Sequence, residues 1–346
     1  MIQANNRFLT QSLILPAILC AGLTSCTNHH VKEITQTAIW RDTDGNTINA
    51  HGGGILYYNN IYYWYGECKG DSTYRLEKVT TWECYRAEAG GVSCYSSRNL
   101  LDWKFEGIVL PVAKGDTSSD LHPTNVIERP KVIYNEKTGK FVMWMHIDND
   151  DYTKAMAGVA ISNTPVGPFT YLGSFKPGGG DSRDQTIYRD DDGRAYQIAS
   201  SEWNKTLYIS LLNADYTKTT GIYTRNFIDA SREAPAVFKR NGKYYIITSA
   251  CSGWDPNQAS YAVADSMLGT WKTIGNPCSG LAADKTFYAQ STFVLQVPGK
   301  NGLYIAMFDR WNKTDLIGSR YIWLPVKFAN EQIEVPWTDK WKPDLN

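Results

Sequence analysis

The chain has 346 residues, of which 42% are hydrophobic, and it carries 35 Lys and Arg residues against 35 Asp and Glu residues. This length and apolar fraction are sufficient for a large packed core. The formal net charge of zero gives no basis for a nucleic-acid partner or for electrostatic binding to an anionic membrane surface. Length alone suggests about two domains of roughly 150 residues, although all-β folds often exceed this size as one unit.

The first 26 residues are typical of a bacterial lipoprotein signal peptide. Arg7 precedes an apolar stretch at 13–23 that is too short to span a bilayer, and the sequence Leu-Thr-Ser-Cys at 23–26 resembles a lipobox. This interpretation makes Cys26 the acylated first residue of the mature chain and the polar residues 27–36 a tether. We therefore expect a lipid anchor in the cell envelope, at the outer membrane, with the protein facing the periplasm or the cell surface. An ordinary signal peptide with an incidental cysteine is the alternative.

Five cysteines follow the tether, and their number and spacing limit their roles. Export permits disulfides, but an odd number leaves at least one thiol outside a disulfide, and no spacing typical of a metal site occurs. The run 190–193, Asp-Asp-Asp-Gly, resembles a calcium-binding sequence and is interpreted as a hairpin tip. We expect no metal ion and no cofactor. The cysteines are Cys68, Cys84, Cys94, Cys251 and Cys278.

Five later segments share one plan, in which an apolar run, a tight turn and a second apolar run follow one another. Turns such as Asn-Gly between β-branched and aromatic runs predict β-hairpins. Each hairpin continues into a second pair of β-like runs, and repeats of roughly 40–50 residues with four strands are typical of propeller blades. The sequence therefore predicts an all-β, five-bladed β-propeller over residues 37–346, with few helices and with the polar insertion 69–90 as a loop over one face. The hairpins span 52–67, 129–146, 184–200, 231–249 and 290–308.

A single polar residue stands at the start of four of these hairpins. We call Glu128, Asp184, Glu233 and Gln290 the mouth residues; the first hairpin has His51 in this place. Because the first strand of each blade lines the central channel of a propeller, the mouth residues are expected to converge. Converging carboxyl groups suit glycoside hydrolysis, which needs a protonated acid and a second group that activates water. A neighbouring carboxylate raises the pKa of such an acid.

The chain resembles glycoside hydrolase family 43, the five-bladed propeller enzymes, over about residues 38–337. Four stretches carry the resemblance: AHGGGILYYNNIYYWYGE at 50–67, ERPKVIYN at 128–135, RDQTIYRDDDGRAYQIASSE at 183–202 and REAPAVFKRNGKYYIITS at 232–249. The resemblance implies an enzyme that inverts the anomeric configuration. It also implies that Glu233 is the general acid and that Asp184 orients this acid and raises its pKa.

The usual catalytic base of the family, an aspartate that begins the first blade, is absent. Its place is held by Ala50, His51 and three glycines, and the nearest acids, Asp42 and Asp44, lie in a turn-like sequence. Together with the Glu128-Arg129 pair, this departure resembles the exo-β-1,3-galactanase branch of the family. In that branch a glutamine, here Gln290, is proposed to act as the base through its imidic acid tautomer. Alternatively, Gln290 only positions water, and Glu128, which resembles a residue that binds the terminal sugar, shares the work of the base.

Further candidates for substrate binding are Arg129, Tyr152, Trp254 and Glu67; an ion pair with Glu128 is the alternative role for Arg129. The sequence thus predicts a monomeric exo-hydrolase that releases galactose from β-1,3-galactan, such as the galactan of arabinogalactan side chains. An α-L-arabinofuranosidase or β-xylosidase of the same fold is one alternative. A non-catalytic glycan-binding lipoprotein is another, and the missing aspartate favours it.

Overall fold

A computed structural model describes residue 1, residues 32–300 and residues 302–345. Cys26, most of the predicted signal peptide and residues 27–31 of the predicted tether lie outside this part of the chain. Within the described residues, no helix is both long enough and apolar enough to cross a membrane. Residues 33–346 form one compact unit.

Four sheets of four antiparallel strands follow one another along the chain. In each, the strands pair in sequence order, as expected for propeller blades, and the first two strands form one of the predicted hairpins. The first sheet comprises β2 (His51–Tyr58), β3 (Ile61–Arg75), β4 (Tyr85–Ser97) and β5 (Lys104–Leu110), and the second β6 (Val126–Asn135), β7 (Lys140–Asp148), β8 (Met156–Ser162) and β9 (Thr170–Phe175). The third comprises β10 (Gln185–Arg189), β11 (Ala195–Ser201), β12 (Thr206–Leu212) and β13 (Thr219–Asn226), and the fourth β14 (Arg232–Arg240), β15 (Lys243–Ala250), β16 (Ser260–Ala264) and β17 (Lys272–Gly275).

Two further sheets have three strands each, and they correct the predicted blade count. One contains β19 (Gln290–Gln296), β20 (Tyr304–Arg310) and β21 (Arg320–Pro325); the other contains β18 (Cys278–Ser279), β23 (Gln332–Pro336) and β22 (Lys327–Ala329). The propeller has six blades, one for each sheet of three or four strands, and the prediction of five was wrong. The sixth sheet has strands of only two to five residues. None of the hairpins predicted from the sequence corresponds to it.

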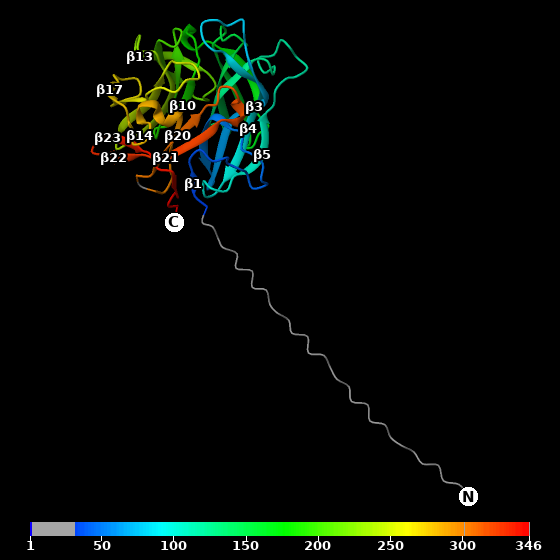
Figure 1. The fold of residues 1–346 in the computed structure, drawn as a ribbon. Helices are drawn as coiled ribbons and strands as arrows, with labels where there is room; N and C mark the ends of the chain where they lie inside the picture. The colour runs from blue at the N-terminus through cyan, green and yellow to red at the C-terminus, as the bar shows by residue number, and fades with distance from the viewer. Residues whose placement is uncertain (2–31, 301, 346) are drawn as a thin grey trace. The chain divides into compact units, whose positions relative to one another are not determined.

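The inner strands β2, β6, β10, β14 and β19 pack side by side in a closed circle, so that β19 also contacts β2. Between neighbouring sheets lie the hydrophobic clusters that form the core. One of them joins the two ends of the chain, because Trp64 and Trp103 of the first sheet pack against Trp323 of β21. Figure 1 accordingly shows the red and orange strands β20 and β21 beside the blue and cyan strands of the first sheet. This circle places the mouth residues around one channel.

The ends of the described domain are fastened to each other. Strand β1 (Ile34–Thr35) pairs with β24 (Lys340–Trp341), and Figure 1 shows β1 near the C-terminus. The buried side chain of Gln36 donates to the carbonyl of Trp323 at 2.8 Å and accepts from its amide at 3.0 Å. Residues 34–36, assigned to the tether by the sequence, therefore belong to the folded domain.

Helical structure among the described residues is limited to three short 3-10 turns: η1 (Pro177–Gly179), η2 (Ala283–Tyr288) and η3 (Leu316–Gly318). The expectation of few helices is thus confirmed there. The expectation of a loop over 69–90 was wrong, because β3 continues to Arg75 and β4 begins at Tyr85, so that the two strands form an extended hairpin with bulges. Lys313 forms ion pairs with Glu83 in the tip of this hairpin and with Asp255 in the loop after β15.

Candidate active site

Three inner strands carry a bulge directly after the residue at the channel mouth. The pairing register slips by one residue after His51, after Glu128 and after Glu233. The next residue in each strand has a positive φ: 58° at Gly52, 54° at Arg129 and 53° at Ala234. A bulge bends its strand and re-aims a side chain. Because a left-handed conformation is costly for residues other than glycine, its recurrence at Arg129 and Ala234 marks a strained functional site.

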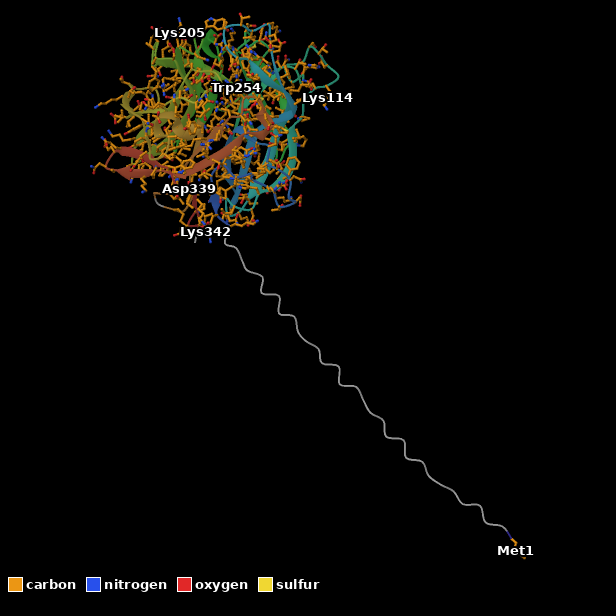
Figure 2. The ribbon with its side chains drawn as sticks, in the orientation of Figure 1. Met1, Lys114, Lys205, Trp254, Asp339 and Lys342 are labelled. Atoms are coloured by element: carbon orange, nitrogen blue, oxygen red, sulfur yellow. The ribbon has the colours of Figure 1, made fainter. Side chains whose placement is uncertain are left out.

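The mouth residues open into a pocket of about 400 Å³, within the range of roughly 300–1,000 Å³ that is usual for small-molecule sites. Figure 2 shows Trp254 and Lys205 toward one end of the domain and Asp339 and Lys342 at the other, so the pocket lies away from the paired ends of the domain. All eight residues predicted to act in catalysis or substrate binding line this pocket, namely Glu67, Glu128, Arg129, Tyr152, Asp184, Glu233, Trp254 and Gln290.

The carboxyl group of Glu233 is held from two sides. Gln290 donates its amide N–H to Oε1 at 3.0 Å, and the Nδ2 atom of Asn204 lies 3.5 Å from Oε2. Burial in the pocket and the negative charge of Asp184 raise the pKa of Glu233 to about 8. Glu233 is therefore protonated at neutral pH, which is the state that a general acid requires.

Arg129 connects Asp184 to the opposite side of the channel. Its guanidinium donates to both carboxylate oxygens of Asp184, at 3.2 and 2.9 Å, and to the backbone carbonyl of Ser291 at 3.0 Å. Such a bidentate contact fixes the orientation of a carboxylate. The sequence left open an ion pair between Arg129 and Glu128; in the structure the partner is Asp184 instead.

The amide of Gln290 makes four hydrogen bonds and can face only one way. Its Oε1 accepts from Arg129 at 2.5 Å and from the indole N–H of Trp311 at 3.0 Å. Its Nε2 donates to Glu233 and to the hydroxyl of Ser249, each at 3.0 Å. Because an indole nitrogen and a guanidinium are donors only, Oε1 must point toward them and the NH₂ group toward Glu233.

Glu128 remains a charged carboxylate within the pocket wall. It accepts from the hydroxyl of Tyr152 at 2.9 Å and lies 3.4 Å from Nδ1 of His146. Burial alone would raise the pKa of Glu128, but the hydrogen bond from His146 and the charge of Lys69 outweigh it and hold the pKa well below the usual range. His146 is itself clamped by Asp148 at 3.0 Å. An ionised carboxylate with a free lone pair is suited to accept sugar hydroxyls.

Glu67 is fixed by the glycine run of the first inner strand. A Cβ at Gly52 would lie 2.2 Å from Oε1 of Glu67, and Lys69 forms an ion pair with its Oε2 at 2.6 Å. Trp254 closes the neighbouring wall, where it packs against Trp311 at 5.3 Å between ring centroids and donates its N–H to the carbonyl of Tyr85 at 3.1 Å.

His51, at the place of the missing aspartate, lies beneath the pocket and does not line it. It is 0% exposed, stacks on Tyr321 with 5.1 Å between ring centroids and has Nδ1 3.6 Å from Asp309. Its ring contacts Trp311 at 5.7 Å between centroids. His51 therefore supports the indole that orients Gln290.

The sequence missed several residues that line the pocket or bond to a residue that lines it, and strand register would have found His146 of the first kind and Ser249 of the second. His146 pairs across the hairpin with Glu128, and Ser249 pairs with Glu233. Counting from each turn to the residue opposite the mouth residue identifies both. No comparable signal exists for the loop residues that line the pocket, among them Trp82, Trp203, Asn204, Cys251 and Trp311.

One group of side chains in the described residues has ligand atoms close enough to hold a metal ion. The ligand atoms of Glu128, His146 and Asp184 all lie within 4.8 Å of one another. Asp184 already binds Arg129 through both carboxylate oxygens. Burial would lower the pKa of His146, but hydrogen bonds to Asp148 and Glu128 raise it to about 9. A protonated imidazole does not bind a metal. The aspartate run at 190–193 is a hairpin tip, in which Asp190 is buried and accepts from Lys239 and Tyr244.

A protonated carboxyl beside a fixed carboxylate, in a sugar-sized pocket walled by indoles, defines a glycoside hydrolase. Residues 55–285 match the model of glycosyl hydrolases family 43. The chain belongs to this family.

Comparison with solved structures gives close relatives. A family 43 β-1,3-galactosidase solved with galactodeoxynojirimycin is 42% identical, with a TM-score of 0.82 over 89% of this chain and 100% of that one. An exo-β-1,3-galactanase from Phanerochaete chrysosporium, solved with galactose, is 37% identical, with a TM-score of 0.79 over 90% and 69% of the two chains. An exo-β-1,3-galactanase from Clostridium thermocellum is 38% identical, with a TM-score of 0.78 over 90% and 66%. No curated protein matched the chain.

Proposed function

We propose that this protein is an inverting exo-hydrolase that releases galactose from the end of β-1,3-galactan. The observation that carries the proposal is the carboxyl of Glu233, whose pKa is raised to about 8 within a pocket that also holds Asp184. Binding alone needs no proton donor of this kind, so the site favours an enzyme over a glycan-binding protein. Its relatives named as β-1,3-galactosidases and exo-β-1,3-galactanases support galactan as the substrate.

The channel below the pocket is filled by side chains, which limits how a polysaccharide can approach the site. Arg129 and Lys131 are both buried, and Nζ of Lys131 donates to the carbonyl of Gly52 at 2.7 Å. These side chains connect neighbouring inner strands, so a polysaccharide cannot thread through the channel. It reaches the site only from the channel mouth. The relatives named as exo-β-1,3-galactanases support attack at the chain end.

In the proposed mechanism, Glu233 gives its proton to the leaving oxygen while a water molecule attacks from the opposite face of the sugar. Asp184 stays charged and keeps the proton on Glu233. Glu67, Glu128, Arg129, Tyr152 and Trp254 hold the terminal galactose. After the proton transfer, one group must accept the proton of the attacking water.

The hydrogen bonds of Gln290 bear on which group accepts that proton. An imidic acid tautomer has an O–H in place of the amide carbonyl, but Oε1 of Gln290 faces only the donors of Arg129 and Trp311. This resting arrangement leaves an O–H without an acceptor and favours the ordinary amide. We propose that Gln290 holds Glu233 and the attacking water in place. Glu128 is then the candidate for the group that accepts the proton of the water.

The decisive experiment incubates the protein, expressed from residue 27, with β-1,3-galactan, an aryl α-L-arabinofuranoside and an aryl β-xyloside. We expect galactose alone, first formed as the α-anomer by proton NMR, and its loss in the Glu233→Gln variant. Release of arabinose or xylose instead would assign one of the other activities of the fold. Binding of galactan without any product would assign a glycan-binding role, which the missing first-blade aspartate favours.

We also propose that the protein is a monomeric lipoprotein of the bacterial cell envelope. The lipobox-like sequence at 23–26 supports the anchor. All eight predicted site residues come together within one chain, so the proposed site is complete without a second copy. The pocket lies at the end of the domain away from Asp339 and Lys342 (Figure 2), near which the domain begins with β1. A tether attached at β1 therefore leaves the pocket accessible to a polymeric substrate.

A further inference from the structure

The turn between β11 and β12 has an unusual backbone at the rim of the pocket. Glu202, Trp203 and Asn204 all have positive φ, of 52°, 56° and 64°. Each such residue costs about 1–2 kcal/mol relative to the right-handed conformation, and strain of this kind collects at ligand-binding positions. The carboxylate of Glu202 holds the turn, because it accepts from Thr206 at 2.7 Å and from Tyr208 at 2.8 Å.

The turn presents Trp203 to solvent from the pocket wall. Trp203 is 68% exposed, and it is the only tryptophan among the exposed large hydrophobic residues of the described chain. One face of its ring is covered by the guanidinium of Arg183, whose Cζ lies 4.6 Å from the ring centroid. Arg183 is itself nearly buried and donates to Asp181 at 2.6 Å. An aromatic side chain that is held rigidly but left uncovered contributes little to the core and is available as a binding platform.

The position of Trp203 relative to the acid indicates which part of a substrate it faces. Gln290 occupies Oε1 of Glu233, so Oε2 is the oxygen that remains to deliver a proton. Oε2 faces Asn204 at 3.5 Å, the residue that follows Trp203. The residues assigned to the terminal galactose lie elsewhere in the pocket wall: Glu67 on β3, Glu128 on β6 and Tyr152 in the loop after β7. The side of the pocket formed by Asn204 and Trp203 is therefore next to the leaving group.

We propose that Trp203 forms a second sugar subsite, in which its exposed ring stacks on the apolar face of the galactose that departs with the leaving oxygen. This inference rests on the proposed function and deepens it, because it names a residue that selects substrates with a sugar, rather than a small group, beyond the cleaved bond. Arg183 covers one face of the ring and leaves the other face for the sugar, so part of the platform is already in place before binding.

The test compares two substrates that differ only beyond the cleaved bond. β-1,3-Galactobiose places a galactose in the proposed subsite, whereas β-galactosyl fluoride places only fluoride there. For Trp203→Ala we expect kcat/KM on galactobiose to fall roughly tenfold, equivalent to about 1.4 kcal/mol, and the loss on galactosyl fluoride to be much smaller. Trp203→Phe should restore most of the activity on galactobiose. Phe105→Ala, which removes another exposed aromatic residue from the outer strand β5, is the matched control and should behave as wild type.

A binding measurement separates this inference from the function on which it rests. In the Glu233→Gln background, calorimetric titration should show weaker binding of galactobiose when Trp203 is also replaced by Ala, and unchanged binding of galactose. Equal losses on both substrates, or unchanged binding of galactobiose, would overturn the assignment of Trp203. If the wild-type protein hydrolyses neither substrate, the proposed function itself fails.

Discussion

At the scale of single residues, the state of the Glu233 proton is set mainly by its surroundings. Burial is the first cause of its raised pKa and the charge of Asp184 is the second. A general acid works only while it is protonated, so activity must fall as the pH rises through its pKa. The alkaline limb of the rate profile is therefore expected near pH 8.

Replacing Asp184 by Asn tests the electrostatic share of this shift. The substitution removes a negative charge that disfavours ionisation of Glu233, so the pKa of Glu233 should fall and the alkaline limb should move to lower pH. Part of the elevation should remain, because burial is unchanged. The measurement is kcat/KM against pH with a folded variant. An alkaline limb that stays in place would show that Asp184 does not act on Glu233.

The role of Gln290 is tested against that of Glu128. A water molecule must attack whatever group departs, so Gln290→Ala should lower kcat on galactobiose and on β-galactosyl fluoride alike, by at least about 10²-fold if it orients the water. Glu128→Ala removes both a sugar ligand and the competing proton acceptor. Near wild-type kcat in Gln290→Ala, together with a large loss of kcat in Glu128→Ala, would show that Gln290 does not orient the water and would leave Glu128 as the candidate base.

The catalytic candidates could be predicted from the sequence because similar polar residues recur at the starts of similar hairpins. Glu128, Asp184, Glu233 and Gln290 recur at the starts of similar hairpins, and all four line the pocket. The partner of Arg129 could not be predicted, because its ion pair with Asp184 joins two different blades. The exposure of Trp203 could not be predicted either. It depends on a turn whose residues have positive φ but include no glycine, so the sequence does not indicate this backbone conformation.

At the scale of elements, the bulge after His51 determines how Gly52 and Glu67 lie relative to each other in the first hairpin. Gly52 is required there for two reasons, a φ of +58° and a space that Glu67 fills. The sequence shows the glycine run but not which glycine is constrained, since the answer depends on the register between β2 and β3. The blade count failed for a related reason, because the strands of the sixth sheet are too short to have a sequence period of their own.

Gly52→Ala should therefore damage the site more than the fold. The added Cβ would lie 2.2 Å from Oε1 of Glu67, so Glu67 must move and kcat/KM should fall by more than about tenfold. Gly45→Ala is the matched control, because Gly45 also has a positive φ, of 88°, but no atom lies within 4 Å of its added Cβ. Both variants should lose about 1–2 kcal/mol of unfolding free energy from backbone strain, measured by denaturant titration. Equal activity in the two variants would contradict the assignment of Glu67 to the substrate.

At the scale of the whole molecule, the proposed anchor predicts where the enzyme is found. Cys26→Ser removes the thiol that would carry the lipid. We expect the variant to lose labelled fatty acid and to leave the membrane fraction, while activity on soluble β-1,3-galactan is unchanged because residue 26 precedes the folded domain. Labelled fatty acid on the Cys26→Ser protein would refute the lipobox interpretation.

The pairing of β1 with β24 also sets an order of events during biosynthesis. Ile34 is among the first residues of the domain to emerge from the ribosome, and its partner Trp341 is among the last. Contacts between the two ends of a chain close the largest possible loop, and folds that depend on them form slowly. The circle of inner strands cannot close while the nascent chain is incomplete. If the proposed signal peptide engages a translocation channel before synthesis is complete, the domain is still open at that moment and can be threaded through the channel.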